Sequence, residues 1–95
     1  MKVRFTPAAR REFLEVLRYL KDQNPEAARK VREQVEKSLQ RLEKFPDSGR
    51  RLPEHPELDY REVLVPPYRF FYKVVPKTVW IVAVWHSSQH PSPPS

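Results

Sequence analysis

The sequence predicts an α+β domain with a short N-terminal strand, an antiparallel helix hairpin, and an antiparallel sheet of about four strands that the hairpin covers on one face. Two observations support this prediction. Apolar residues recur at helical spacing between residues 9 and 45, and at strand spacing between residues 59 and 85. Prolines also cluster between these segments. Since the chain has 95 residues, we expect one domain over residues 1–89.

The N-terminal half is expected to form a strand and two helices. Lys2 to Thr6 alternates polar and apolar side chains, which is typical of a short strand. Thr6 is a good N-cap, and Pro7 loses no hydrogen bond at the first position of a helix. Asn24 and Pro25 repeat this arrangement for a second helix. The apolar stripes of the two helices are Ala9, Phe13, Val16, Leu17 and Leu20, and then Ala28, Val31, Val35, Leu39 and Leu42.

The C-terminal half is expected to form a loop and a three-stranded meander. Residues 46–58 contain three prolines and the only glycine, which predicts a loop without regular structure. Strands are predicted at Asp59–Val65, Tyr68–Val75 and Thr78–Trp85. Pro66-Pro67 and Pro76-Lys77 are the predicted turns, the second of type I. Residues 90–95 are rich in proline and serine and are expected to be disordered.

Two-residue turns set a register for these strands. They place Val74 opposite Val79, Tyr72 opposite Ile81, Phe70 opposite Ala83 and Tyr68 opposite Trp85. We expect the helix hairpin to cover this apolar face. The other face mixes charged and apolar side chains, and no third layer is expected to cover it: Glu62, Leu64, Arg69, Phe71, Lys73, Trp80, Val82, Val84 and His86.

An uncovered apolar patch rimmed by charge is typical of an interaction surface. The candidate binding residues on this face are Arg69, Phe71, Lys73, Trp80, Val84 and His86. Arg69 and His86 are expected to converge at one end, where they would form a partner or phosphate site. The alternative is that both are isolated surface residues.

Composition restricts the function further. The chain has no cysteine, which excludes disulfides, thiol catalysis and a cysteine-based zinc site, and its single glycine excludes a P-loop. We expect no cofactor and no metal, because the histidines lack ligand spacing. No apolar run reaches the roughly 18 residues of a membrane span, and a cytoplasmic location is expected. The net charge of +6 favours an acidic partner. The charged face of the second helix is either simply solvated or part of a groove for that partner.

The order of the elements, together with Tyr68-Arg69-Phe70-Phe71-Tyr72-Lys73-Val74 and Val84-Trp85-His86, resembles the RelE/ParE superfamily of bacterial type II toxins. The opening Phe5-Thr6-Pro7-Ala8-Ala9 with Phe13, and the Phe-Pro-x-x-Gly-Arg segment at residues 45–50, fit the same pattern. The resemblance covers roughly residues 1–89. It implies a toxin held inactive by a cognate antitoxin, which we expect to be an acidic segment that folds on binding within an oligomeric complex.

The superfamily has two branches, of which RelE-like members cut mRNA on the ribosome and ParE-like members poison DNA gyrase. Arg69 matches the arginine that ribonuclease members use for the phosphate. Those members also carry lysines on the preceding strand, where this chain has Tyr60 and Glu62. They place an arginine just after the last strand, where this chain has His86-Ser87-Ser88-Gln89. A glutamate beside the scissile phosphate would repel RNA.

A second ribonuclease subgroup uses Glu, Arg and His with a terminal Tyr. Glu54 or Glu57 with Arg69 and His86 would imitate that set, although Ser87 stands where the subgroup has Tyr. The His-x-Ser ending instead looks like ParE members. The resemblance therefore favours a gyrase inhibitor without catalytic residues. The alternatives are a ribosome-dependent mRNA endoribonuclease using Arg69, His86 and Glu54, and an interaction domain that is inactive as a toxin.

Overall fold

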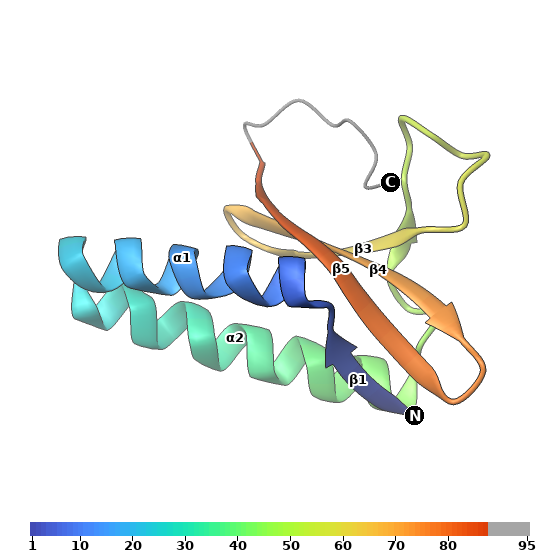
Figure 1. Cartoon of the computed structure of the whole chain (residues 1–95), viewed down its shortest axis with the longest axis horizontal. Coiled ribbons are helices and arrows are strands. Elements are labelled where there is room, and N and C mark those ends of the chain that lie inside the picture. The colour runs from blue at the N-terminus through green and yellow to red at the C-terminus, as the bar shows by residue number, and fades with distance from the viewer. Residues whose placement is uncertain (88–95) are drawn as a thin grey trace.

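The computed structural model describes residues 1–87 and consists of a helix hairpin packed on one face of a five-stranded sheet (Figure 1). The predicted α+β class is confirmed, and the tail predicted at 90–95 lies outside the described residues. The elements are β1 (Lys2–Phe5), α1 (Pro7–Gln23), α2 (Pro25–Lys44), β2 (Arg50–Arg51), β3 (Arg61–Val65), β4 (Tyr68–Val75) and β5 (Thr78–His86).

Both predicted helix starts are confirmed. The Thr6 hydroxyl accepts a hydrogen bond from the Ala9 N–H at 3.2 Å, and Pro7 opens α1. Asn24 serves both helices: its N–H donates to the Leu20 carbonyl at 2.6 Å, and its side chain accepts from the first turn of α2. One residue thus ends α1 and begins α2, which makes the hairpin connection short.

The sheet has the strand order β1-β5-β4-β3-β2, with β1 parallel to β5 and the other pairs antiparallel. It therefore differs from the expected antiparallel sheet of about four strands. The additional strand, β2, lies in the segment that was expected to be an irregular loop. It pairs Arg50 with Glu62 and Arg51 with Arg61. A hydrogen bond from the Gly49 N–H to the Tyr72 hydroxyl, at 2.8 Å, holds the chain against the sheet at this point.

A β-bulge between β4 and β5 changes the predicted register. The predicted pairs of Val74 with Val79 and Tyr72 with Ile81 are confirmed, but Val82 is an extra residue and Phe71 then lies opposite Ala83. From there on, every side chain of β5 lies on the opposite face from the one predicted. Val84 accordingly belongs to the core under the hairpin, and Ala83 and Trp85 to the other face. In the turn before β5, Lys77 has a φ of 72°, as in a type II rather than a type I turn.

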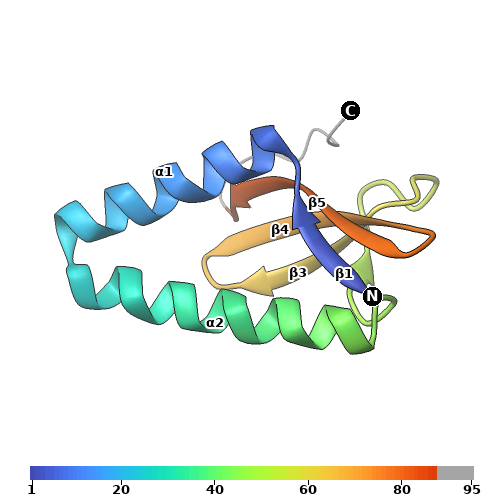
Figure 2. The ribbon, with the colours of Figure 1, turned by 60° about the horizontal axis from the view of Figure 1, so that its bottom comes forward.

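The main core lies between the hairpin and the sheet, whose arrangement Figure 2 shows from a second side. Phe70 is central to it: its ring meets Phe13 of α1 edge-on at 5.6 Å, and Phe13 stacks on Phe5 of β1 at 5.6 Å. The predicted burial of Tyr68, Phe70, Tyr72 and Ile81 under the hairpin is confirmed, and that of Ala83 is wrong.

The other face of the sheet is partly covered, contrary to the prediction. Leu52, Phe71 and Ala83 form a second buried cluster, against which Tyr60, Val82 and Trp85 pack. Leu52 and Tyr60 come from the proline-rich segment between β2 and β3. This segment acts as the third layer that the sequence did not indicate.

Candidate functional site

Four charged side chains form a network on this second face. The Arg69 Nε donates to Glu62 Oε2 at 2.6 Å, and its Nη2 donates to Glu54 Oε1 at 2.7 Å. Arg50 donates to the other oxygen of Glu62. The Glu62 side chain is 0% exposed and that of Arg69 only 9%. The Arg69 guanidinium also lies over the Phe71 ring, 4.9 Å from its centroid. The network thus pairs two arginines with two glutamates, and its charges balance.

The network stabilises the charged forms of Glu54 and Arg69. Hydrogen bonding from Arg69 is the main cause that lowers the pKa of Glu54. Burial works to lower the pKa of Arg69, but hydrogen bonds to Glu54 and Glu62 outweigh it, so the pKa of Arg69 is raised. Both groups therefore stay charged near neutral pH and are suited to holding structure rather than to transferring protons.

His86 lies away from this network. Because of the bulge it pairs with Tyr68, whose ring it meets edge-on at 5.6 Å. It lines a cavity of about 350 Å³ beside α1, together with Glu12, Glu15 and Tyr19. The expected convergence of Arg69 and His86 is therefore wrong, since β4 and β5 present them on opposite faces. The structure does bring Glu54 and Arg69 together.

The remaining candidate binding residues divide into two groups. Phe71 is 1% exposed and Val84 is buried, so neither is an accessible contact residue, contrary to the expectation of an uncovered face. Lys73 is exposed and Trp80 half-buried, and they form a cross-strand pair. Arg4 of β1 continues this row, because β1 pairs Arg4 with Trp80.

Trp80 also lines a hollow of about 600 Å³ with Arg4, Arg10 and apolar side chains of β1 and α1. We call Arg4, Arg10, Lys73 and Trp80 the Trp80 surface. Arg4 and Arg10 were missed from the sequence, because their place depends on the parallel pairing of β1 with the far end of the chain. The only sequence signal was the density of arginines near the N-terminus.

Within residues 1–87, no group of three His, Cys, Asp or Glu side chains is placed to hold a metal ion. Neither helix of this part of the chain is both long and apolar enough to cross a membrane.

Comparisons with known proteins identify the family. Residues 3–91 match the family model described as the ParE toxin of the type II toxin-antitoxin system parDE. The fold is similar to a chain of the chromosomal ParDE system from P. aeruginosa, with a TM-score of 0.69 and 18% identity over 90% of this chain and 95% of that one. It is also similar to a chain of the RelBE2 toxin-antitoxin complex from Mycobacterium tuberculosis, with a TM-score of 0.62 and 24% identity over 93% and 92% of the two chains. A search of curated protein sequences found no match. The chain therefore belongs to the ParE toxin family of type II toxin-antitoxin systems.

Proposed function

We propose that this toxin acts in the cytoplasm by inhibiting DNA gyrase without cutting RNA, and that a cognate antitoxin neutralises it. The match to the ParE family model supports the choice of target. The observation that carries the proposal is that Arg69 is already paired with Glu54 and Glu62. Arg69 is the residue that an RNA-cleaving relative would need at the phosphate.

Arg69 is poorly suited to binding a phosphate. Its guanidinium already contacts Glu62 and Glu54, and it is largely buried over Phe71. Drawing it toward RNA would leave the buried Glu62 carboxylate with Arg50 alone, which is costly in a low-dielectric environment. His86, the candidate acid or base, lies on the opposite face of the sheet. This arrangement supports a toxin that works by binding.

The Trp80 surface is the proposed contact with gyrase. Tryptophan and arginine are the residue types that most often dominate the binding energy of protein interfaces. Here a half-buried tryptophan lies in a row with Arg4 and Lys73 across three adjacent strands. Such a row can provide an apolar anchor with cations on both sides.

The test compares two activities of the purified protein: inhibition of gyrase supercoiling, and cleavage of mRNA on ribosomes. We expect the first and not the second. Trp80→Ala should weaken inhibition by about thirtyfold, as the loss of an anchor worth about 2 kcal/mol does. The matched control, His86→Gln, should inhibit as the wild type does. Cleavage of ribosome-bound mRNA by the wild type, abolished in His86→Gln, would instead establish the ribonuclease.

The antitoxin part of the proposal is tested in cells. The net charge of +6 favours an acidic partner segment. Co-expression with the product of the adjacent small gene should relieve toxicity, and the two proteins should co-purify as an oligomeric complex. Continued toxicity, with nothing co-purifying, would contradict this part.

A further inference from the structure

The cavity of about 350 Å³ beside α1 is lined by acidic and phenolic side chains. Glu12, Glu15 and Tyr19 follow one another at intervals of three and four residues on α1, so their side chains share one face of the helix. Tyr68 and Val84 line the cavity from the sheet. We call this hollow the α1–β5 cavity.

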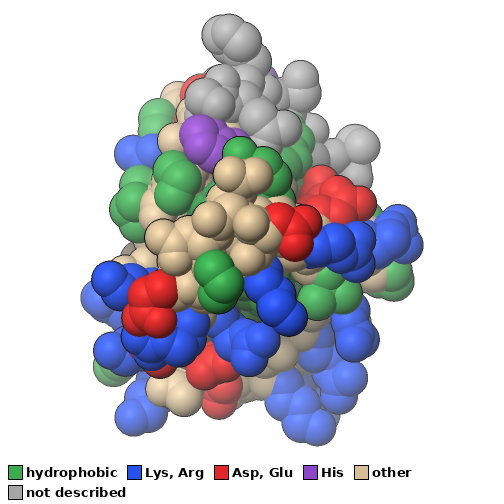
Figure 3. All heavy atoms as spheres, turned by 90° about the vertical axis from the view of Figure 1, so that its left-hand side faces the viewer, with side chains coloured by type: hydrophobic (Ala, Val, Ile, Leu, Met, Phe, Trp, Pro, Cys, Tyr) green, Lys and Arg blue, Asp and Glu red, His purple; other side chains and the backbone are tan. Residues whose placement is uncertain are grey.

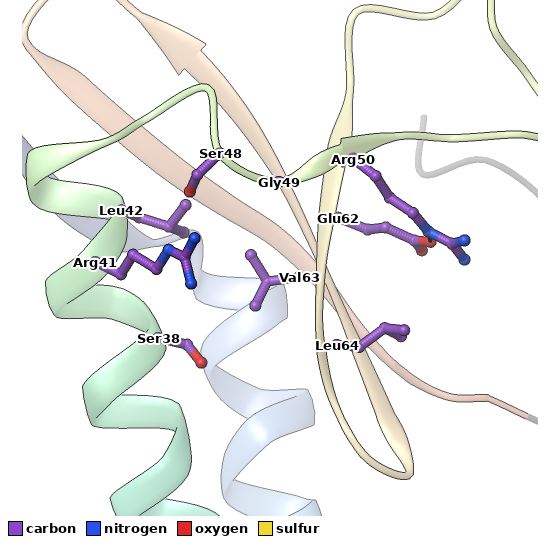
Figure 4. A pocket seen from close by; sticks show the side chains of 9 residues that line it. All are labelled: Ser38, Arg41, Leu42, Ser48, Gly49, Arg50, Glu62, Val63 and Leu64. Carbon is purple, nitrogen blue, oxygen red and sulfur yellow. Dashed lines mark hydrogen bonds and ion pairs between the residues drawn. The ribbon is translucent and has the colours of Figure 1, made fainter.

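The two carboxylates of the α1–β5 cavity have no cationic partner. Neither Glu12 nor Glu15 belongs to an ion pair within residues 1–87, and no Lys or Arg of that range lines the cavity. Glu62, by contrast, is bound by Arg69 and by Arg50, whose side chain Figure 4 shows beside it. Lys and Arg side chains gather on the end of the molecule that Figure 3 presents, in line with the net charge of +6. The acidic cavity is thus an exception on a basic molecule.

The cavity also offers hydrogen-bond acceptors at the edge of β5. The Glu12 Oε1 accepts from the Val84 N–H at 3.0 Å, and the second oxygen of this carboxylate has no partner among the described residues. Both backbone groups of a residue in an antiparallel strand are directed to the same edge. The Val84 carbonyl is therefore directed to this side too, beyond Ile81, where the pairing with β1 ends.

Tyr68 adds a buried polar side chain whose hydroxyl has no partner. The residue is 6% exposed, and its hydroxyl makes no hydrogen bond within residues 1–87. Since no fully enclosed side-chain oxygen or nitrogen of these residues lacks a partner, the hydroxyl must itself reach the cavity. Burial raises the pKa of Tyr68, and the nearby Tyr19 adds to this effect. Because buried polar groups are normally hydrogen-bonded, an unpaired hydroxyl here is suited to meeting a ligand.

We propose that the α1–β5 cavity binds a guanidinium group, as an arginine side chain carries. The groups that a ligand could reach there are all able to accept hydrogen bonds: the second oxygen of Glu12, the Glu15 carboxylate, the Tyr68 hydroxyl and the Val84 carbonyl. A guanidinium presents five donors in one plane, and its face can stack on an aromatic ring such as that of Tyr19. An ammonium, with three donors at one point, would reach fewer of these acceptors.

The inference is independent of the proposed gyrase target, because none of these residues belongs to the Trp80 surface. A guanidinium could reach the cavity on a protein chain or as a small molecule. The probes are therefore an acetylated, amidated Gly-Arg-Gly peptide and agmatine, which carries the same group without a peptide. Two further peptides replace the arginine by citrulline, which has nearly the same shape without the charge, or by lysine.

Binding is followed by the amide chemical shifts of the whole protein. Glu15→Gln removes a charge from the cavity, and Tyr68→Phe removes only the unpaired hydroxyl. The matched controls are Glu36→Gln on the exposed side of α2 and Tyr60→Phe on the second face of the sheet. Glu12 is left unchanged, because its carboxylate also binds the edge of β5.

We expect the arginine peptide to shift the amide signal of Val84, and the citrulline peptide to leave it unchanged. Glu15→Gln and Tyr68→Phe should each weaken binding about fivefold, as the loss of one hydrogen bond does, whereas both controls bind as the wild type does. Agmatine binding equal to that of the peptide would support a small-molecule ligand, and tighter binding of the peptide would support an arginine of a protein chain. Equal binding of the citrulline peptide, tighter binding of the lysine peptide, or wild-type affinity in both test variants would overturn the inference.

Discussion

Gly49 and Tyr72 join the loop after α2 to the centre of the sheet. The Tyr72 hydroxyl donates to the Pro46 carbonyl at 2.7 Å and accepts from the Gly49 N–H at 2.8 Å. Arg61 adds a bond to the Gly49 carbonyl at 2.9 Å. Burial raises the pKa of Tyr72, so its hydroxyl stays protonated and keeps donating. These residues place the start of β2 and hence the arginine that pairs with Glu62.

A side chain at position 49 would not fit this arrangement. A Cβ there would lie 2.5 Å from the Tyr72 hydroxyl and 2.7 Å from the Glu62 carbonyl oxygen, which is backbone and cannot rotate away. Gly49→Ala should therefore lower the free energy of unfolding by about 1–3 kcal/mol, as overpacking does. Thermal melts against the control Ser48→Ala measure this. A Gly49→Ala melt equal to that of the control would contradict the close contact.

At the level of elements, a side chain of α1 accepts a hydrogen bond from the edge of β5 beyond the point where β1 ends. β1 pairs with β5 only as far as Phe5 and Ile81. Beyond that point the Thr6 N–H donates to the Ile81 carbonyl at 2.9 Å, and the Glu12 carboxylate accepts from the Val84 N–H at 3.0 Å. A helix side chain thus takes the place of a neighbouring strand, next to the bulge.

Glu12→Ala should leave the Val84 N–H without its partner. Since an unsatisfied buried donor costs about 1–3 kcal/mol, we expect a loss of that order in the free energy of unfolding. Chemical denaturation measures it, and Glu12→Gln, which keeps an acceptor oxygen, should lose less. Equal stability of Glu12→Ala and the wild type would show that water replaces the carboxylate without cost.

Packing of the hairpin on the sheet depends on Phe70. It is 2% exposed and contacts Phe13 of α1. Phe70→Ala should cost about 3–5 kcal/mol because a cavity remains, against a total stability of about 5–15 kcal/mol for a typical domain. A large drop in melting temperature is expected. Leu64→Ala, on an exposed residue of β3, is the control. A melt unchanged by Phe70→Ala would mean that the hairpin covers the other face.

At the level of the whole molecule, the net charge is +6, but the network of Arg50, Arg69, Glu54 and Glu62 is charge-balanced. Its ion pairs hold the proline-rich segment against the second face of the sheet. Glu54 is the member of that network from the proline-rich segment. Its contact with Arg69 therefore links the covering segment to β4. Stability of this covering depends on Glu54 being ionised.

The stabilising effect of Glu54 should be lost in acid. Its pKa in the folded state is lowered, mainly by the hydrogen bond from Arg69. The contact therefore stabilises the fold above the usual glutamate pKa of about 4.3, and the effect disappears as the pH falls through the lowered value. The melting temperature of the wild type should exceed that of Glu54→Gln near pH 7, and this difference should shrink toward pH ~3. A difference independent of pH would argue against an ionic role, and Glu36→Gln on the exposed side of α2 serves as control.

The sequence by itself determined the elements with local signals. Thr6-Pro7 and Asn24-Pro25 define the helix starts, and a cap needs only residues within one turn of itself. The spacing of apolar residues predicted the hairpin and the three long strands, and the motif around Arg69 predicted the family. Of the candidate site, Lys73 and Trp80 remain accessible as expected, and Glu54 does meet Arg69.

Only the tertiary structure decided how these elements are aligned. The extra residue at Val82 moves His86 to the face opposite Arg69. No residue near Val82 predicts this bulge, because a bulge reflects packing on both faces of the sheet. β2 exists because Tyr72, far along the chain, binds the loop at Gly49. Whether Arg69 is available to a ligand depends on Glu62 and Glu54, which reach it from another strand and from a loop. Such contacts join residues distant in sequence, and the local pattern of side chains does not encode them.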